Sequence, residues 1–186
     1  RYELTLEPHN QRWALALDAP TQLPEGVSLS GPLTATLRQP LTERRRLQLA
    51  ASLDYRFNVD EEPGTLRRNL ALPPGSNPRA RDLARQWRAT DSDPASLIGK
   101  AQALFATSFT YTLQPPLLGE HSIDDFLFRT QRGFCEHYAA AFVFLMRAAG
   151  IPARVVSGYL GGEFNPLDGY LIVRQSDAHA WAEVWL

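Results

Sequence analysis

The residues with the clearest chemical potential are one cysteine and one histidine, Cys135 and His179. Cys135 is the only cysteine among the 186 residues, and it stands where the most helical pattern of the chain begins, at residues 136–149. Unpaired backbone N–H groups and the positive dipole end of a helix start stabilise a thiolate. A single cysteine is more often a buried packing residue, but this position favours a nucleophile.

The residues around Cys135 fit a rigid mount for such a nucleophile. Gly133 allows a tight turn just before it, and the backbone N–H of Cys135 could donate a hydrogen bond to an oxyanion. Residues 139–141 are all alanine, so the expected helix could approach a sheet closely. Gly150 and Pro152 should end this helix.

His179 lies in a strand-like segment at residues 178–186, in which small and large side chains alternate. The alternation predicts one face with Ala178, Ala180, Ala182 and Val184, and another with His179, Trp181, Glu183 and Trp185. An imidazole among large aromatic side chains, which exclude water, suits a general base. A histidine in a strand is, however, more often structural. The long separation from Cys135 puts the two residues on different elements, as is usual for cysteine–histidine pairs.

The other candidate residues are weaker. His137 lies two positions beyond Cys135, so on a helix it should point away from the thiol; His121 and His9 are expected to have ordinary roles. No group of His, Cys, Asp or Glu has the spacing of a metal site. Gly161-Gly162 suits a tight turn and lacks the residues of a phosphate-binding loop. We therefore expect no metal and no cofactor.

Composition excludes several classes of partner. The chain is 44% hydrophobic and 21% charged, and its 19 basic and 20 acidic residues nearly cancel, so neither nucleic acid nor an anionic membrane surface is an expected partner. No apolar run approaches the roughly 20 residues that span a bilayer. One cysteine cannot form a disulfide within the chain, so cysteine usage does not indicate the redox compartment. The chain starts and stops inside strand-like segments, and we therefore interpret it as a piece of a longer protein.

The hydrophobic period divides the sequence into two parts. Residues 1–72 alternate with a period of two, as in Leu47 and Leu49 or Tyr55, Phe57 and Val59, and turn residues such as Gly31-Pro32 separate the runs. This part is predicted to be a small antiparallel β domain with a packing or presentation role. Residues 73–78 are rich in proline and glycine and predict a linker.

The second part, residues 79–186, predicts helices first and strands afterwards, which indicates an α+β domain. Asn77 with Pro78, Asp93 with Pro94, and the segment 122–125 are each expected to start a helix. Residues 109–113 look extended. Three strand-like segments follow the central helix, at residues 153–160, 170–174 and 178–186.

Three stretches of this second part, residues 132–139, 147–159 and 177–185, resemble the transglutaminase-like core (RGFCEHYA, RAAGIPARVVSGY and DAHAWAEVW). More narrowly, the chain resembles the periplasmic domain of bacterial inner-membrane transglutaminase-like proteins (the TgpA type). The resemblance covers residues 104–186, whereas the β part fits that subgroup only loosely. It implies a papain-like α+β fold for residues 79–186, as a catalytic core truncated at its C-terminal end.

The resemblance also implies a Cys–His–Asp triad, of which Cys135 and His179 match the first two members. Asp177 and Asp168 are poor substitutes for the third, which we expect beyond Leu186. Without it the imidazole would be poorly oriented, so this stretch could be inactive on its own although the full-length protein is an enzyme.

Two features depart from the animal transglutaminases. Phe134 and Glu136 flank the cysteine where those enzymes carry Gln and Trp. Their oxyanion-hole tryptophan has no clear counterpart here, and Trp87 is a poor candidate. Calcium is not expected, because no acidic loop has the required pattern.

The implied function is that of a protein-glutamine gamma-glutamyltransferase, which forms a cysteine thioester with a glutamine donor and passes the acyl group to a lysine or another amine. Two alternatives stay open at this point. Water could replace the amine, which would make the protein a cysteine protease or amidase-type hydrolase with the same dyad. The fold could instead serve as a non-catalytic binding module. The resemblance further implies protein or peptide substrates and a periplasmic domain of a membrane-anchored inner-membrane protein.

Overall fold

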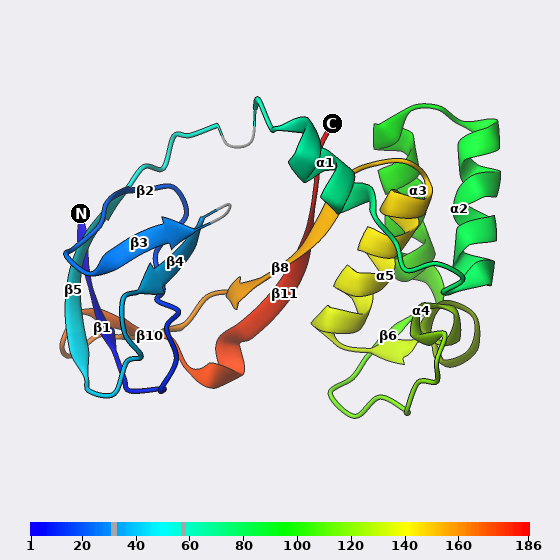
Figure 1. Cartoon of the computed structure of the whole chain (residues 1–186). Coiled ribbons are helices and arrows are strands. Elements are labelled where there is room, and N and C mark those ends of the chain that lie inside the picture. The colour runs from blue at the N-terminus through cyan, green and yellow to red at the C-terminus, as the bar shows by residue number, and fades with distance from the viewer. Residues whose placement is uncertain (31–32, 57–58) are drawn as a thin grey trace. The chain divides into compact units, whose positions relative to one another are not determined.

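The computed structural model describes residues 1–30, 33–56 and 59–186, which form two compact units, Arg1–Asp60 and Glu61–Leu186 (Figure 1). The turn predicted at Gly31-Pro32 and Phe57 of the predicted Tyr55–Val59 alternation lie outside the described residues. Each unit is described by itself below.

The first unit is an antiparallel β structure, as predicted. Strands β1, β5 and β2 form one sheet in that order, and β3 pairs with β4 as a hairpin. Their bounds are β1 (Tyr2–Leu6), β2 (Pro20–Gln22), β3 (Val27–Ser30), β4 (Thr34–Leu37) and β5 (Arg45–Ala51). The period-two pattern of β5 buries Leu47 and Leu49 almost completely, while the alternate residues Arg46 and Gln48 are exposed. With Leu6, Leu37 and Leu41 they form the core of this unit.

The boundary between the units differs from the predicted one. Helix α1 (Pro63–Leu70) occupies residues that were expected to belong to the β domain, and the units divide after Asp60. The predicted linker at residues 73–78 connects α1 with α2 inside the second unit. Pro63 reads as a turn residue, but its fixed φ also suits the first position of a helix. Leu66 and Leu70, one turn apart on α1, are both partly buried.

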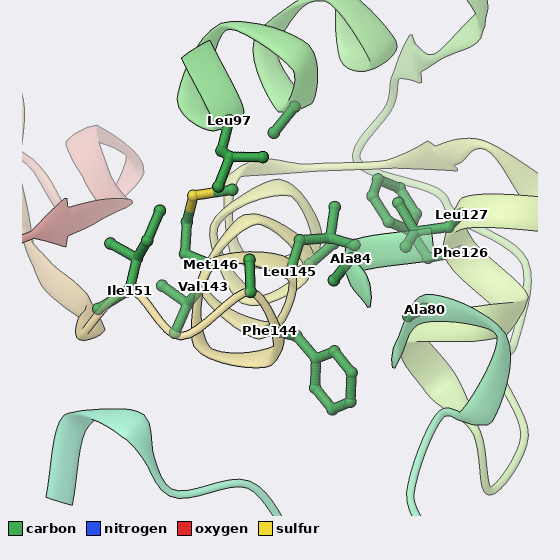
Figure 2. Packing of buried hydrophobic residues seen from close by; sticks show 14 residues of the cluster. Ala80, Ala84, Leu97, Phe126, Leu127, Val143, Phe144, Leu145, Met146 and Ile151 are labelled. Atoms are coloured by element: carbon green, nitrogen blue, oxygen red, sulfur yellow. The ribbon is translucent and has the colours of Figure 1, made fainter. Parts of the chain in front are cut away.

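The second unit packs its helices around α5 (Cys135–Ala148). The surrounding helices are α2 (Pro78–Thr90), α3 (Pro94–Ser108), α4 (Ser122–Asp125) and the π-helical turn η1 (Phe126–Thr130). Figure 2 shows Leu97 of α3 pointing towards Met146 of α5, and both side chains are fully buried. As predicted, Asp93 caps α3 by accepting the backbone N–H of Ser96 at 3.0 Å.

Asn77 caps a helix, but not the predicted one. Its backbone is left-handed, with φ of 49°, and its side chain makes no bond to α2. Instead, Asn77 Oδ1 accepts the backbone N–H groups of Ile123 and Asp124, at 2.9 and 3.2 Å. The carboxylate of Asp124 in turn accepts the N–H groups of Arg79 and Ala80 at the start of α2, at 3.0 and 2.8 Å. The first turns of α2 and α4 therefore cap each other.

The strands of the second unit form three pairs. The short β6 (Thr110–Tyr111) runs parallel to β7 (Arg132–Gly133), and β8 (Ala153–Tyr159) runs antiparallel to β11 (Ala178–Val184). A further hairpin joins β9 (Glu163–Asn165) to β10 (Tyr170–Ile172), and a 3-10 turn, η2 (Gln175–Asp177), precedes β11. Strand β9 was not predicted. The predicted α+β class of this unit is confirmed.

Within the described residues, every helix is too short or too polar to cross a lipid bilayer.

Candidate functional site

Cys135 is the first residue of α5, which confirms the predicted position at a helix start. Phe134 before it is extended, with φ of −120°, so the chain enters the helix through a sharp change of direction. The thiol-bearing residue is half-buried, whereas Ala141 and Leu145 farther along α5 are fully buried. The buried helix α5 thus carries an accessible cysteine at its N-terminal end, where backbone N–H groups point outward.

Gly133 is required for the close packing just before Cys135. A Cβ at this position would lie 2.7 Å from both Cβ and Cγ of His137 and 3.0 Å from Cε2 of Phe126. His137 is committed to this turn: its Nδ1 accepts the backbone N–H of Phe134 at 3.4 Å, and its ring packs edge-on against that of Phe134. His137 therefore belongs to the packing of the first turn of α5.

Replacing Gly133 by alanine should lower the free energy of unfolding by about 1–3 kcal/mol, because the added methyl group overfills a packed site. Urea denaturation measures this change. Gly99→Ala is the matched control, since a Cβ there meets nothing within 4 Å inside α3 and should be neutral or stabilising. Equal stability of the two variants would contradict the close packing at Gly133.

A residue that the sequence did not indicate, Tyr111, lies beside Cys135. The parallel pairing of β6 with β7 sets Tyr111 against Gly133, and the N–H of Thr112 donates to the Gly133 carbonyl at 2.8 Å. The hydroxyl of Tyr111 accepts the backbone N–H of Cys135 at 3.3 Å. A parallel pair of two residues, far apart in sequence, leaves no periodic signal that could have predicted this contact.

An aromatic cluster supports this side of α5. The ring of Tyr111 stacks on that of Tyr138, one turn after Cys135, with centroids 6.0 Å apart and planes 25° apart. Tyr138 also packs against Phe105, Phe109 and Phe126, at centroid distances of 5.4, 6.0 and 5.2 Å. Burial, with a smaller contribution from Tyr111, raises the pKa of Tyr138. The wall next to the thiol is therefore largely apolar.

His179 lies near the start of β11, opposite Gly158 of β8. Ala180 is buried, and Ala182 and Val184 pack against the helical core, as the predicted alternation requires, whereas Ala178 is exposed. His179 is half-buried, and in the part of the chain that the structure describes its imidazole makes no hydrogen bond or ion pair.

A second cross-strand pair fixes the register that sets the position of His179. Glu183 is opposite Arg154, whose Nε donates to Glu183 Oε2 at 2.8 Å. The Arg154 guanidinium also lies over the ring of Trp185, 5.0 Å from its centroid. Nearer His179, the ring of Trp181 covers Gly158, where a Cβ would be only 3.0 Å from Cη2.

The structure brings Cys135 and His179 to the same end of two adjacent elements. Helix α5 packs along β11 (Figure 1). Val184 at the end of β11 is paired with Ala153, which follows shortly after the end of α5. The ends of α5 and β11 are therefore close together, and their starts, with Cys135 and His179, lie at the other end of the pair. No hydrogen bond joins the thiol to the imidazole, and the dyad therefore stays a prediction.

The two aspartates closest to His179 in sequence have other partners. Asp177 accepts the backbone N–H of Arg174 at 2.7 Å, and Asp168 accepts the side-chain amide of Asn165 at 3.4 Å. Among the described residues, no group of three or more His, Cys, Asp or Glu side chains is arranged to hold a metal ion.

A cysteine at the start of a central helix that packs on an antiparallel strand pair is the arrangement of the papain-like α+β class. The sequence model of the Transglutaminase-like superfamily matches residues 81–186. The chain belongs to this superfamily.

Similar proteins come from several bacteria. The chain is 43% identical over its whole length to a protein-glutamine gamma-glutamyltransferase of Pseudomonas aeruginosa, of which it covers 28%. It is 32% identical over 170 residues to YebA of Bacillus subtilis, which is 83% of this chain and 22% of that protein. The chain therefore spans about a quarter of the length of these relatives.

Solved structures agree with the fold. The crystal structure of the periplasmic domain of TgpA from Pseudomonas aeruginosa superposes with a TM-score of 0.94 at 42% identity, over 99% of this chain and 64% of that one. A proposed cysteine protease from Cytophaga hutchinsonii matches with a TM-score of 0.50 at 16% identity, over 98% of this chain and 66% of that one, which shows the fold alone.

Proposed function

We propose that the whole protein is a protein-glutamine gamma-glutamyltransferase in which Cys135 is the nucleophile and His179 its general base. The observation that carries this proposal is the half-buried thiol at the start of α5, in a chain that is 43% identical throughout to a protein bearing that name. His179 lies near the start of β11, at the end where the adjacent helix α5 begins with Cys135, and this position supports its role as the general base.

The reaction would proceed through an acyl-enzyme. His179 takes the proton of the Cys135 thiol, and the thiolate attacks the carboxamide carbon of a substrate glutamine. The negative charge on the former carbonyl oxygen faces the backbone N–H of Cys135. The imidazolium returns its proton to the departing nitrogen, which leaves as ammonia. A lysine amine then attacks the thioester, forms an isopeptide bond and releases the thiol.

An aspartate outside this stretch of sequence would complete the site by orienting the imidazole, as the triad of the family resemblance implies. We also propose a periplasmic location, which the similarity to the TgpA periplasmic domain supports, in a membrane-anchored protein, as the family resemblance implies. Its substrates would be proteins with an accessible glutamine and proteins with an accessible lysine.

Replacing Cys135 by alanine in the whole natural protein should reduce amine incorporation into a glutamine peptide by at least about 10³-fold, because no other group forms the thioester. Mass spectrometry of the peptide with and without a primary amine measures this reaction. Thermal unfolding of the variant controls for folding, since the side chain of Cys135 is small and half-buried.

The same measurement separates transfer from hydrolysis. A wild-type protein that converts glutamine to glutamate even with excess amine is a hydrolase, and this result would replace the transferase proposal. Undiminished amine incorporation by Cys135→Ala would show that the nucleophile is another residue.

A further inference from the structure

The contact between Tyr111 and Cys135 has a geometry that suits an oxyanion hole. The Tyr111 hydroxyl oxygen lies 3.3 Å from the backbone nitrogen of Cys135 and accepts its N–H. A phenol hydroxyl also carries a proton of its own. In the part of the chain described by the structure, that proton has no acceptor, so it is available to another oxygen.

Two donors at this separation can share one acceptor. Donors of an oxyanion hole lie about 2.7–3.1 Å from the oxygen that they stabilise. An oxygen at this distance from both the Cys135 nitrogen and the Tyr111 hydroxyl forms a compact triangle with them. The carbonyl oxygen of an acyl group bonded to Cys135 Sγ starts close to that residue's own backbone nitrogen, so it can reach this position.

We propose that Tyr111 donates the second hydrogen bond to the oxyanion formed at Cys135. This assignment rests on the proposed acyl transfer and names a residue that touches the reacting oxygen. When substrate binds, the hydroxyl moves off the N–H of Cys135, and both groups donate to the incoming oxygen.

The surroundings of Tyr111 allow this exchange. Its backbone is held by the pairing of β6 with Gly133, two residues before the nucleophile, so the ring stays beside Cys135. One face of the ring stacks on Tyr138. The side of the residue away from this support is open, since Tyr111 is 57% exposed. The hydroxyl can therefore shift by a small ring movement without disturbing the core.

The test is Tyr111→Phe in the whole natural protein, which removes the hydroxyl and keeps the stacked ring. The kcat for amine incorporation should fall by about 10²–10³-fold, the usual loss for one oxyanion donor, with KM unchanged. The rate at which iodoacetamide alkylates Cys135 should also stay unchanged, because substitution at that carbon forms no oxyanion. Thermal unfolding confirms that the variant folds.

Tyr138→Phe is the matched control, because it removes a hydroxyl from the adjacent ring of the same stack, and its kcat should equal that of the wild type. An active wild type with an equally active Tyr111→Phe variant would overturn the assignment of Tyr111 alone. So would a parallel fall in alkylation, which indicates a structural role, or a rise in kcat, which indicates that the hydroxyl blocks the site. A wild type no more active than Cys135→Ala would overturn the proposed function and the donor role together.

Discussion

Replacing His179 by glutamine should slow acyl-enzyme formation by about 10²–10⁴-fold, the range that a positioned general base contributes. Glutamine keeps a polar side chain at this position but cannot take the proton of the thiol. The imidazole makes no hydrogen bond or ion pair in the described part of the chain, and His179 is only half-buried. We therefore expect the variant to fold and melt like the wild type, so that the loss is one of chemistry.

Single-turnover kinetics with a glutamine peptide measure this step directly, as the release of ammonia on formation of the thioester. His9→Gln is the control: His9 lies in the first unit, where its ring stacks on Trp13, and its loss should leave the rate unchanged. A His179→Gln protein that acylates at the wild-type rate would show that another group takes the proton.

The sequence alone predicted the helix and the strand that carry the candidate residues, because each has a periodic residue pattern. The apolar run after Cys135 and the glycine that follows it define α5, and the alternation around His179 defines β11, because helices and strands of this length leave a periodic pattern. The same reasoning predicted that His137 points away from the thiol, and the structure packs its ring against Phe134 in the first turn of α5. These elements carry both residues proposed for the dyad.

The parts that were missed depend on contacts between distant segments. Tyr111 reaches Cys135 through a two-residue parallel pair, and Asn77 caps a helix 46 positions away instead of its own. Neither contact has a local signature, since an Asn before a Pro looks like an ordinary cap whichever helix it serves. Helix α1 was hidden for a different reason, because Pro63-Gly64 suits a turn as well as a helix start.

The reciprocal caps predict the largest effect on stability. Asp124 is 6% exposed, and both of its carboxylate oxygens accept backbone N–H groups of α2. Asp124→Ala leaves the N–H groups of Arg79 and Ala80 without these acceptors at the start of a helix. We expect a loss of about 2–4 kcal/mol in the free energy of unfolding, because an unsatisfied buried donor costs about 1–3 kcal/mol.

Urea denaturation of Asp124→Ala and of the control Asp82→Ala tests this expectation. Asp82 lies on α2, the helix that Asp124 caps, but it is exposed, and among the described residues it forms an ion pair with Arg85 alone. The control should lose less than about 1 kcal/mol. Asn77→Ala removes the opposite half of the exchange. Because each side chain holds the turn that presents the other, the two alanine variants should combine with a coupling of about 0.5–3 kcal/mol. Strictly additive losses would mean that the two helix starts are stabilised independently. A loss for Asp124→Ala no larger than that of Asp82→Ala would mean that the stability of the second unit does not depend on this exchange.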